Sequence, residues 1–429
     1  MKNIFKKAFL FLVCTALLTA LSVGTSLTAK AEKYNSNTDW MAGKYGISMH
    51  YLHENAGGQG STVETFSAAV AQFDVEKFAK IANEVGASWV LLTVSQSTGV
   101  TCAPNPVMEE LSGLKLGTDR DLIADVYDAL EPYGIRLMLY FHGGVPTGNT
   151  ALAKAMGANE RVGQADASIG QSTGNYVYKY STSEHIAAMY KDFSDRYGEK
   201  ISGYWIDGCY DNCGFNERIA KLYVTALKSG NPNALVALNR GTKTTDVHYE
   251  GEDYHCGERW SPAAGENMNT IYKDNITSRW TESGRQQQIW SYLGSNWGQG
   301  GTSHNTQEMI EKTYEIISAG AAVTWDICST SIDKKGTIDA GQLEQLRALK
   351  KYIDSKPEIK VEATPTDKGE DPLTIKEEIK VENTPVSDTS VDEVKVEKVN
   401  YDLWLYVALG AEALLIAGAV VLFVLKKKA

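Results

Sequence analysis

Short apolar runs alternate with amphipathic stretches along the chain from residue 45 to residue 355. The apolar runs are rich in β-branched and aromatic residues and have little strict polar alternation, which is typical of buried strands. We predict about eight strands in this region, the number a closed barrel needs. One of them falls within residues 241–285, where the pattern is hardest to interpret, and the others are expected at 45–52, 88–94, 136–142, 201–207, 234–240, 287–293 and 321–328.

The amphipathic stretches have apolar residues at helical spacing and carry recognisable start signals. Asp74 and Asn305 are expected N-caps, and Ser181 with Glu184 fits a capping box. Strands that alternate with helices over this length favour one (β/α)8 TIM-like barrel over an open doubly wound sheet. No glycine-rich phosphate motif follows the first strand, which counts against dinucleotide binding. The predicted helices cover residues 74–84, 119–131, 181–197, 215–228, 305–319 and 339–355.

One strand, in the stretch Ile201–Asp211, ends on a carboxylate that is followed by a glycine. Burying a carboxylate is costly unless the group is paired or used. Barrel enzymes keep their chemistry at the C-terminal ends of their strands, so Asp207 is a candidate catalytic residue. The alternative, in which Asp207 only caps the loop that follows, stays open at this point.

Other polar residues fall at predicted strand ends, and a group of acids lies in the 250s. Two carboxylates at one barrel mouth are what glycosidic cleavage needs, one as the nucleophile or base and the other as the proton donor. Any single loop acid could equally be a solvated charge. The strand-end residues are His50, Gln96, His142, Asn239 and Asp326, and the acids are Glu250, Glu252, Asp253 and Glu258.

Both ends of the chain differ from this central domain, which we place at residues 32–355. Three lysines precede an apolar run that ends at Ala29-Lys30-Ala31, so residues 1–31 are expected to be a signal peptide that is removed on export. Residues 356–400 are rich in Lys, Glu, Pro and Thr and contain a repeated segment, EIKVEATP and EIKVENTP, which predicts a disordered stalk.

The last part of the chain is expected to anchor the protein in a membrane. Residues 401–425 are almost continuously apolar and long enough to cross a bilayer of roughly 30 Å. The lysine-rich residues 426–429 follow at once, which predicts a cytoplasmic tail and an extracellular N-terminal domain.

Charge and cysteine content exclude some partners. The net charge is −11 and no basic patch lies outside the two ends, so nucleic acid is not an expected partner. The cysteines that remain after cleavage are scattered and form no disulfide framework. Cys209 and Cys213 alone would make a poor metal site, and no metal or organic cofactor is expected. The oligomeric state is left open.

Four segments of the chain resemble the α-L-fucosidases of glycoside hydrolase family 29. They are YGISMHYL at 45–52, FDVEKFAKIANEVGASWVLLT at 73–93, YWIDG at 204–208, and LGSNWGQGG with the later AAVTWDI up to residue 327. This resemblance implies a barrel catalytic domain and a retaining mechanism without a cofactor. It also implies that His50 contacts the sugar, that Asp207 is the nucleophile and that Trp205 lines the sugar site.

The chain departs from the family at several positions. The second strand ends in Gln96-Ser97 where the family usually has a His-His pair, and Gln286-Gln287 stand where many members carry the acid. DYHCGERW resembles an earlier loop that supplies the acid in other members, which implies that Glu258 is the acid/base, with Glu252 and Glu282 as alternatives. The closing strand ends in Trp325-Asp326 where the family has a Leu-Asn pattern.

We therefore expect a surface-anchored retaining exo-glycosidase that releases terminal α-L-fucose, or a related sugar, from glycans. Asp207 and Glu258 are the expected catalytic pair. The residues expected to bind the sugar are His50, Gln96, His142, Trp205 and Trp297, the last as an aromatic platform for the C–H face of a pyranose. A catalytically silent glycan-binding barrel and a glycosidase of altered specificity are the alternatives.

Overall fold

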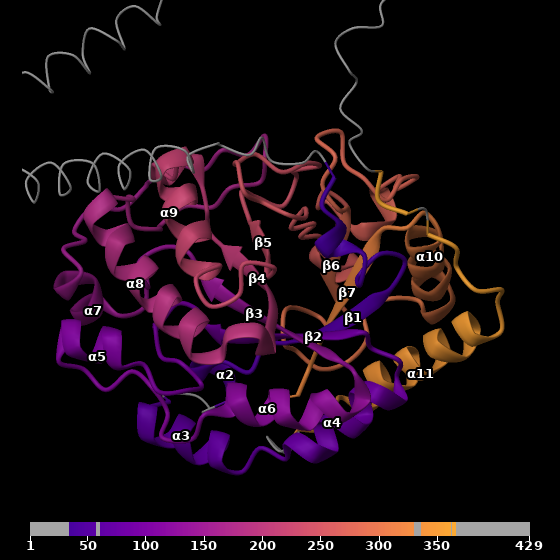
Figure 1. Ribbon diagram of the computed structural model, residues 1–429, viewed down its shortest axis with the longest axis horizontal. Coiled ribbons are helices and arrows are strands. Elements are labelled where there is room, and N and C mark those ends of the chain that lie inside the picture. Colours follow the sequence, from indigo (N-terminus) through magenta and orange to yellow (C-terminus); the bar gives the residue numbers. More distant parts are fainter. Residues whose placement is uncertain (1–33, 57–60, 330–335, 362, 366–429) are drawn as a thin grey trace, which may run out of the picture. The chain divides into compact units, whose positions relative to one another are not determined.

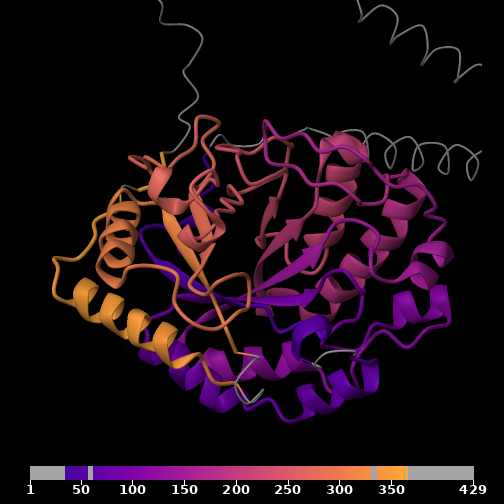
Figure 2. The same ribbon diagram turned by 180° about the vertical axis from the view of Figure 1, so that it is seen from behind.

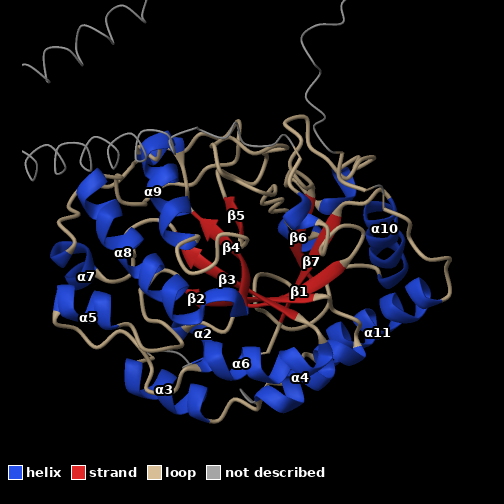
Figure 3. Ribbon diagram, in the orientation of Figure 1, coloured by secondary structure: helices blue, strands red, loops and turns tan. Residues whose placement is uncertain are grey.

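The computed structural model describes residues 34–56, 61–329, 336–361 and 363–365 (Figure 1). Its centre is one parallel sheet with the strand order β5-β4-β3-β2-β1-β7-β6. Strands that follow one another along the chain are neighbours in the sheet, except β5 and β6, which form its two edges. The helices between the strands lie on the outer face of the sheet (Figure 3). The strands are β1 Tyr45–Met49, β2 Trp89–Ser95, β3 Arg136–His142, β4 Ile201–Asp207, β5 Leu235–Leu238, β6 Gln288–Tyr292 and β7 Ala322–Ile327.

The seven strands that were assigned to residue ranges from the sequence are thus confirmed. The sheet is curved and forms a TIM-like half-barrel, which Figures 1 and 2 show from opposite sides. The predicted strand within 241–285 corresponds to an irregular segment, residues 253–259. The amide of Asp253 donates to Val236 of β5, while Glu258 pairs in parallel with Trp290 of β6. This segment hydrogen-bonds to both edge strands of the sheet.

The six predicted helices are present with ends shifted by a few residues. Asp74 caps α4 by accepting from the amide of Lys77, and Asn305 caps α10, as expected. The predicted capping box at Ser181 is wrong because α8 begins one residue earlier and the hydroxyl of Thr182 accepts from the amide of Lys179. These helices are α4 Val75–Glu84, α6 Leu122–Leu130, α8 Tyr180–Tyr197, α9 Glu217–Leu227, α10 Thr306–Ser318 and α11 Ala340–Asp354.

Four further helices lie in the long connections after the first three strands and were not predicted. They are short and sit in loops whose polar character masks their periodicity. They are α2 His53–Ala56, α3 Val63–Ala71, α5 Pro106–Ser112 and α7 Thr150–Ala155.

Alternate side chains of each strand enter two separate apolar clusters. The outward-facing residues pack under the helices, whereas the inward-facing residues form an aromatic cluster inside the sheet that includes Trp89, Tyr140, Trp205 and Trp290. Because side chains alternate along a strand, the same inward-facing series carries polar residues to the C-terminal end of the sheet.

The predicted signal peptide, most of the predicted stalk, the predicted transmembrane segment and the basic tail lie outside the described residues. Within the described ranges, no helix combines the length and the apolar character needed to cross a membrane. The described chain continues beyond residue 355, and Ile359 packs against the outer apolar cluster.

Candidate active site

Polar residues from three neighbouring strands, and from the irregular segment beside β6, lie close to one another at the C-terminal end of the sheet. Tyr140 and His142 follow one another on the inner face of β3, and Trp205 and Asp207 do so on β4. Asn239 comes directly after β5, and Glu258 lies on the segment that pairs with β6. Parallel strands bring their carboxyl ends to the same edge, so the period-2 pattern of the sequence assembles this cluster.

Asp207 accepts hydrogen bonds on both carboxylate oxygens. Its Oδ2 accepts from the hydroxyl of Tyr140 at 2.8 Å, and its Oδ1 accepts from the side-chain amide of Asn239 at 2.9 Å and from the backbone amide of Gly208 at 2.7 Å. The residue remains partly exposed. Donors on both oxygens fix the direction in which the carboxylate points.

Glu258 lies beside Asp207 because one amide group joins them. Asn239 Nδ2 donates to Asp207 Oδ1 at 2.9 Å and to Glu258 Oε2 at 2.7 Å. The distance between the two accepting oxygens therefore cannot exceed the sum of these two hydrogen-bond lengths. That limit lies below the roughly 6.5–9.5 Å of inverting glycosidases and near the roughly 5–5.5 Å of retaining ones.

The surroundings of Glu258 favour its protonated form. Burial, followed by the negative charge of Asp207, raises the pKa of Glu258 to about 8, although the hydrogen bond from Asn239 and the charge of Arg259 oppose the rise. At neutral pH Glu258 is therefore mainly a carboxylic acid, able to give a proton to a leaving oxygen. A charged carboxylate beside a protonated one is the arrangement that a retaining glycosidase uses.

The other acids considered from the sequence are engaged elsewhere. Glu252 is buried and accepts from the backbone amides of Leu238, His248 and Tyr249. Burial raises its pKa to about 7, while those amides oppose the rise. Asp253 pairs with Lys228 at 2.7 Å, and Glu282 is exposed on a loop. Glu258 alone of these acids shares a hydrogen-bond donor with Asp207.

Gln286 and Gln287, which stand where many family members carry the acid, lie far from this cluster. They directly precede β6, at the N-terminal end of the sheet. The side chain of Gln286 accepts from Arg279 and donates to the carbonyl of Gly320, which directly precedes β7. A glutamine at this place therefore takes no proton donor away from Asp207.

His50 is held by a buried carboxylate from the last strand. Its Nδ1 lies 2.7 Å from Asp326 Oδ1, which also accepts from the hydroxyl of Ser48 at 2.7 Å. This bond directs Nδ1 toward the protein and leaves Nε2 for a ligand, since Nε2 has no hydrogen-bond partner among the described residues and is not sealed from solvent. An orienting acid of this kind also fixes the tautomer of a histidine.

Trp297 lies partly exposed beside His50. Its ring centroid is 5.4 Å from that of His50 and 4.4 Å from that of Trp290. The loop that carries it is held by Asp326, whose Oδ2 accepts from the amide of Gly298 at 2.6 Å. Asp326 thus positions both the ring of His50, which can hydrogen-bond, and the aromatic face of Trp297 at the C-terminal end of the sheet.

Gln96 and His142 lie on the other side of Asp207 and together line a narrow cavity with apolar side chains. Gln96 donates to the hydroxyl of Tyr140 at 2.9 Å, which makes it the first member of a chain that leads to Asp207. His142 accepts from the amide of Gly144 through Nδ1 and is partly exposed.

The expectation that Trp205 contacts the sugar is corrected by its burial. The side chain is 0% exposed, donates to the carbonyl of Cys256 at 3.1 Å and stacks on Tyr140 at 5.4 Å between ring centroids. It lies two residues before Asp207 on the same face of β4 and directly opposite Tyr140 on β3, so it supports the Tyr140 ring from the neighbouring strand.

Two residues of the site were not singled out in the sequence. Tyr140 reads as core in an apolar strand, although it shares a face with His142 two positions later. Arg259 follows Glu258 and is 0% exposed. Its five N–H groups meet both carboxylate oxygens of Asp274 and the carbonyls of Thr242, Thr244 and Glu258. This arginine therefore fixes the backbone that carries the acid.

Within the described parts of the chain, no three His, Cys, Asp or Glu residues are grouped so as to hold an ion. The cysteines there are free and buried.

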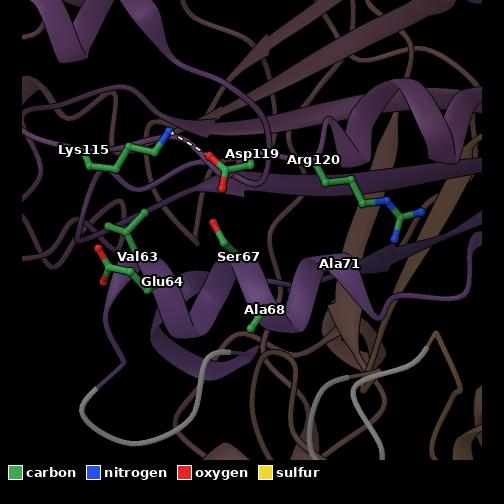
Figure 4. A pocket seen from close by; sticks show the side chains of 8 residues that line it. All are labelled: Val63, Glu64, Ser67, Ala68, Ala71, Lys115, Asp119 and Arg120. Carbon is green, nitrogen blue, oxygen red and sulfur yellow. Dashed lines mark ion pairs between the residues drawn. The ribbon is translucent and has the colours of Figure 1, made fainter.

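A second hollow lies on the outside of the molecule, between α3 and the loop before α6 (Figure 4). It contains none of the predicted site residues, and Lys115 pairs there with Asp119 at 3.2 Å. Its lining consists of Val63, Glu64, Ser67, Ala68, Ala71, Lys115, Asp119 and Arg120.

Comparison with known families and structures gives one extensive match. The family model described as alpha-L-fucosidase matches residues 22–358. No curated protein sequence matches the chain.

The similar solved structures are glycoside hydrolases of low sequence identity, and they establish a shared fold. The endo-fucoidan hydrolase MfFcnA4 of glycoside hydrolase family 107 is 18% identical with a TM-score of 0.55, over 74% of this chain and 53% of that one. The chain thus spans about half the length of that relative. An α-L-fucosidase of family 29 from Bacteroides thetaiotaomicron, trapped as a covalent intermediate, is 16% identical with a TM-score of 0.51, over 74% of each chain.

Proposed function

The chain belongs to the α-L-fucosidase family, and from this premise we propose that it is a retaining exo-glycosidase that releases terminal α-L-fucose, or a close relative, from glycans. In this proposal Asp207 attacks the anomeric carbon and forms a glycosyl-enzyme. Glu258 first protonates the leaving oxygen and then, as a carboxylate, takes a proton from the water that releases the sugar.

The observation that carries the proposal is the amide of Asn239, which donates to both carboxylates. The shared donor limits their separation, and that limit supports double displacement. A neutral donor can hold an ionised and a protonated carboxyl group side by side without a compensating cation. The catalytically silent alternative gains no support from Gln286 and Gln287, because these lie at the other end of the sheet.

For the sugar that is released, we propose a class of compounds and not a single one. Gln96 replaces one of the family's paired histidines, and its amide nitrogen is already used on Tyr140. Sites that recognise hydroxyl groups discriminate sharply by the pattern of donors and acceptors. A related 6-deoxy sugar or a restricted set of fucosides is therefore the variation that we expect. We also propose that the exported domain is tethered to a membrane through residues 401–425.

The proposal is tested by screening aryl glycosides with the wild-type protein and the Asp207→Ala variant. Removing the nucleophile is expected to lower kcat/KM for an aryl α-L-fucoside by at least about a thousandfold, with the fold retained. Asp119→Ala, at the exposed ion pair of the outer hollow, is the matched control and should behave as wild type.

Two results would contradict the proposal. Undiminished hydrolysis by Asp207→Ala would remove this residue from the mechanism. Glycan binding without turnover of any glycoside would instead favour the silent barrel.

A further inference from the structure

The irregular segment between β5 and β6 carries the inward-facing pattern of a strand. Tyr254 and Cys256 belong to the aromatic cluster inside the sheet. Residue 254 pairs in parallel with residue 286, just before β6, and residue 258 pairs with residue 290 within β6, so every second residue faces the same way. Glu258, two positions after Cys256, reaches Asn239 as this series predicts.

Trp260 is the next member of this series, one step outward from the acid. Exposure increases along it, since Tyr254 and Cys256 are buried whereas Glu258 and Trp260 are partly exposed. The backbone of Trp260 is fixed because its amide donates to the carbonyl of Asn269 at 2.9 Å.

The indole of Trp260 extends a row of aromatic side chains at the C-terminal end of the sheet. Its ring centroid lies 6.4 Å from that of Tyr292, and Tyr292 lies 4.7 Å from Trp297, which adjoins His50. The row therefore extends from the expected sugar-binding residues past the acid to the rim.

The role of Glu258 as the acid determines where the leaving group must lie. In the proposed reaction Glu258 protonates the oxygen between the released sugar and its leaving group, so the leaving group must sit beyond Glu258, toward solvent. Aromatic faces pack well against the C–H faces of pyranose rings. On the basis of the proposed function, we propose that Trp260 is the platform for the first sugar of the leaving group, and hence that the substrate is a saccharide chain.

The test compares a substrate that has a leaving-group sugar with one that has none. The probes are α-L-fucosyl fluoride and, from a panel of fucosylated lactose and N-acetyllactosamine isomers, the saccharide that the wild-type protein cleaves fastest. Trp260→Ala is expected to lower kcat/KM for that saccharide by about tenfold, as for a lost aromatic contact, and to leave turnover of the fluoride within about twofold. Trp260→Phe should recover most of the loss because it keeps an aromatic face.

Trp280→Ala is the matched control, since Trp280 is also half-buried but packs on Tyr34 and Arg279, away from the acids. An equal loss of kcat/KM on both substrates in Trp260→Ala, or no loss on either, would contradict the proposed role of Trp260. So would a wild-type protein that cleaves the fluoride but none of the saccharides. Failure of the proposed function looks different, because the wild-type protein would then not cleave the fluoride at all.

Discussion

At the scale of single residues, the candidate site depends on one neutral amide between two acids. Asn239 gives one N–H to Asp207 and the other to Glu258. The bond from Asn239 lowers the pKa of Glu258, but burial and the charge of Asp207 outweigh it and keep that pKa raised. Asp207 has the backbone amide of Gly208 and the hydroxyl of Tyr140 as further donors. Different surroundings of two like groups are what separate an acid from a nucleophile.

The raised pKa of Glu258 predicts the alkaline side of the activity profile. Glu258 must hold a proton to assist departure of the leaving group, so kcat/KM for a glycoside with a poor leaving group should fall as the pH rises through about 8. The measurement is a pH profile of kcat/KM for the wild-type protein and Glu258→Gln.

In Glu258→Gln the alkaline limb should disappear and the rate should drop by about 10²–10⁴-fold. Glu250→Gln, at an exposed loop acid, is the control and should keep the wild-type limb. A limb near pH 8 that survives in Glu258→Gln would assign the proton to another group.

Residue by residue, the sequence predicted the polar members of the site better than the aromatic ones. Asp207, His50 and His142 stand out because a polar residue at the end of an apolar strand is unusual. Tyr140 and Trp205 do not, because both fit a buried strand, and only the structure shows that Tyr140 donates to Asp207 while Trp205 is covered.

At the scale of elements, continuous apolar runs predicted the located strands and the 3.6-residue period predicted the long helices. The region between β5 and β6 shows neither pattern clearly. There the polar residues are satisfied by loops: Arg259 by Asp274 and three carbonyls, Glu252 by three backbone amides. These partners lie at irregular separations along the chain, so no periodic pattern marks them.

Glu252 is therefore predicted to be structural. Glu252→Ala would leave three backbone N–H groups near buried residues without their acceptor and should lower the free energy of unfolding by about 2–4 kcal/mol, as measured by urea denaturation. Glu282→Ala, at the exposed alternative, should change it by less than about 0.5 kcal/mol.

The alkaline limb of activity should remain in the folded Glu252→Ala protein. A variant of normal stability that has lost that limb would instead make Glu252 the proton donor.

At the scale of the whole domain, the two ends of the sheet have different tasks. The candidate site lies at the C-terminal ends of the strands. The last described residues lie at the opposite end, because Val361 closely approaches Gly43, just before β1, and Thr364 bonds to Asp39.

The central claim is that Asp207 and Glu258 work as a pair close enough for double displacement. The most direct measurement is proton NMR of the sugar first released from an aryl α-L-fucoside, taken before mutarotation. The account predicts that α-L-fucose appears first and the β anomer only later. Initial release of the β anomer would mean direct attack by water and would contradict the assignment of Asp207 as nucleophile.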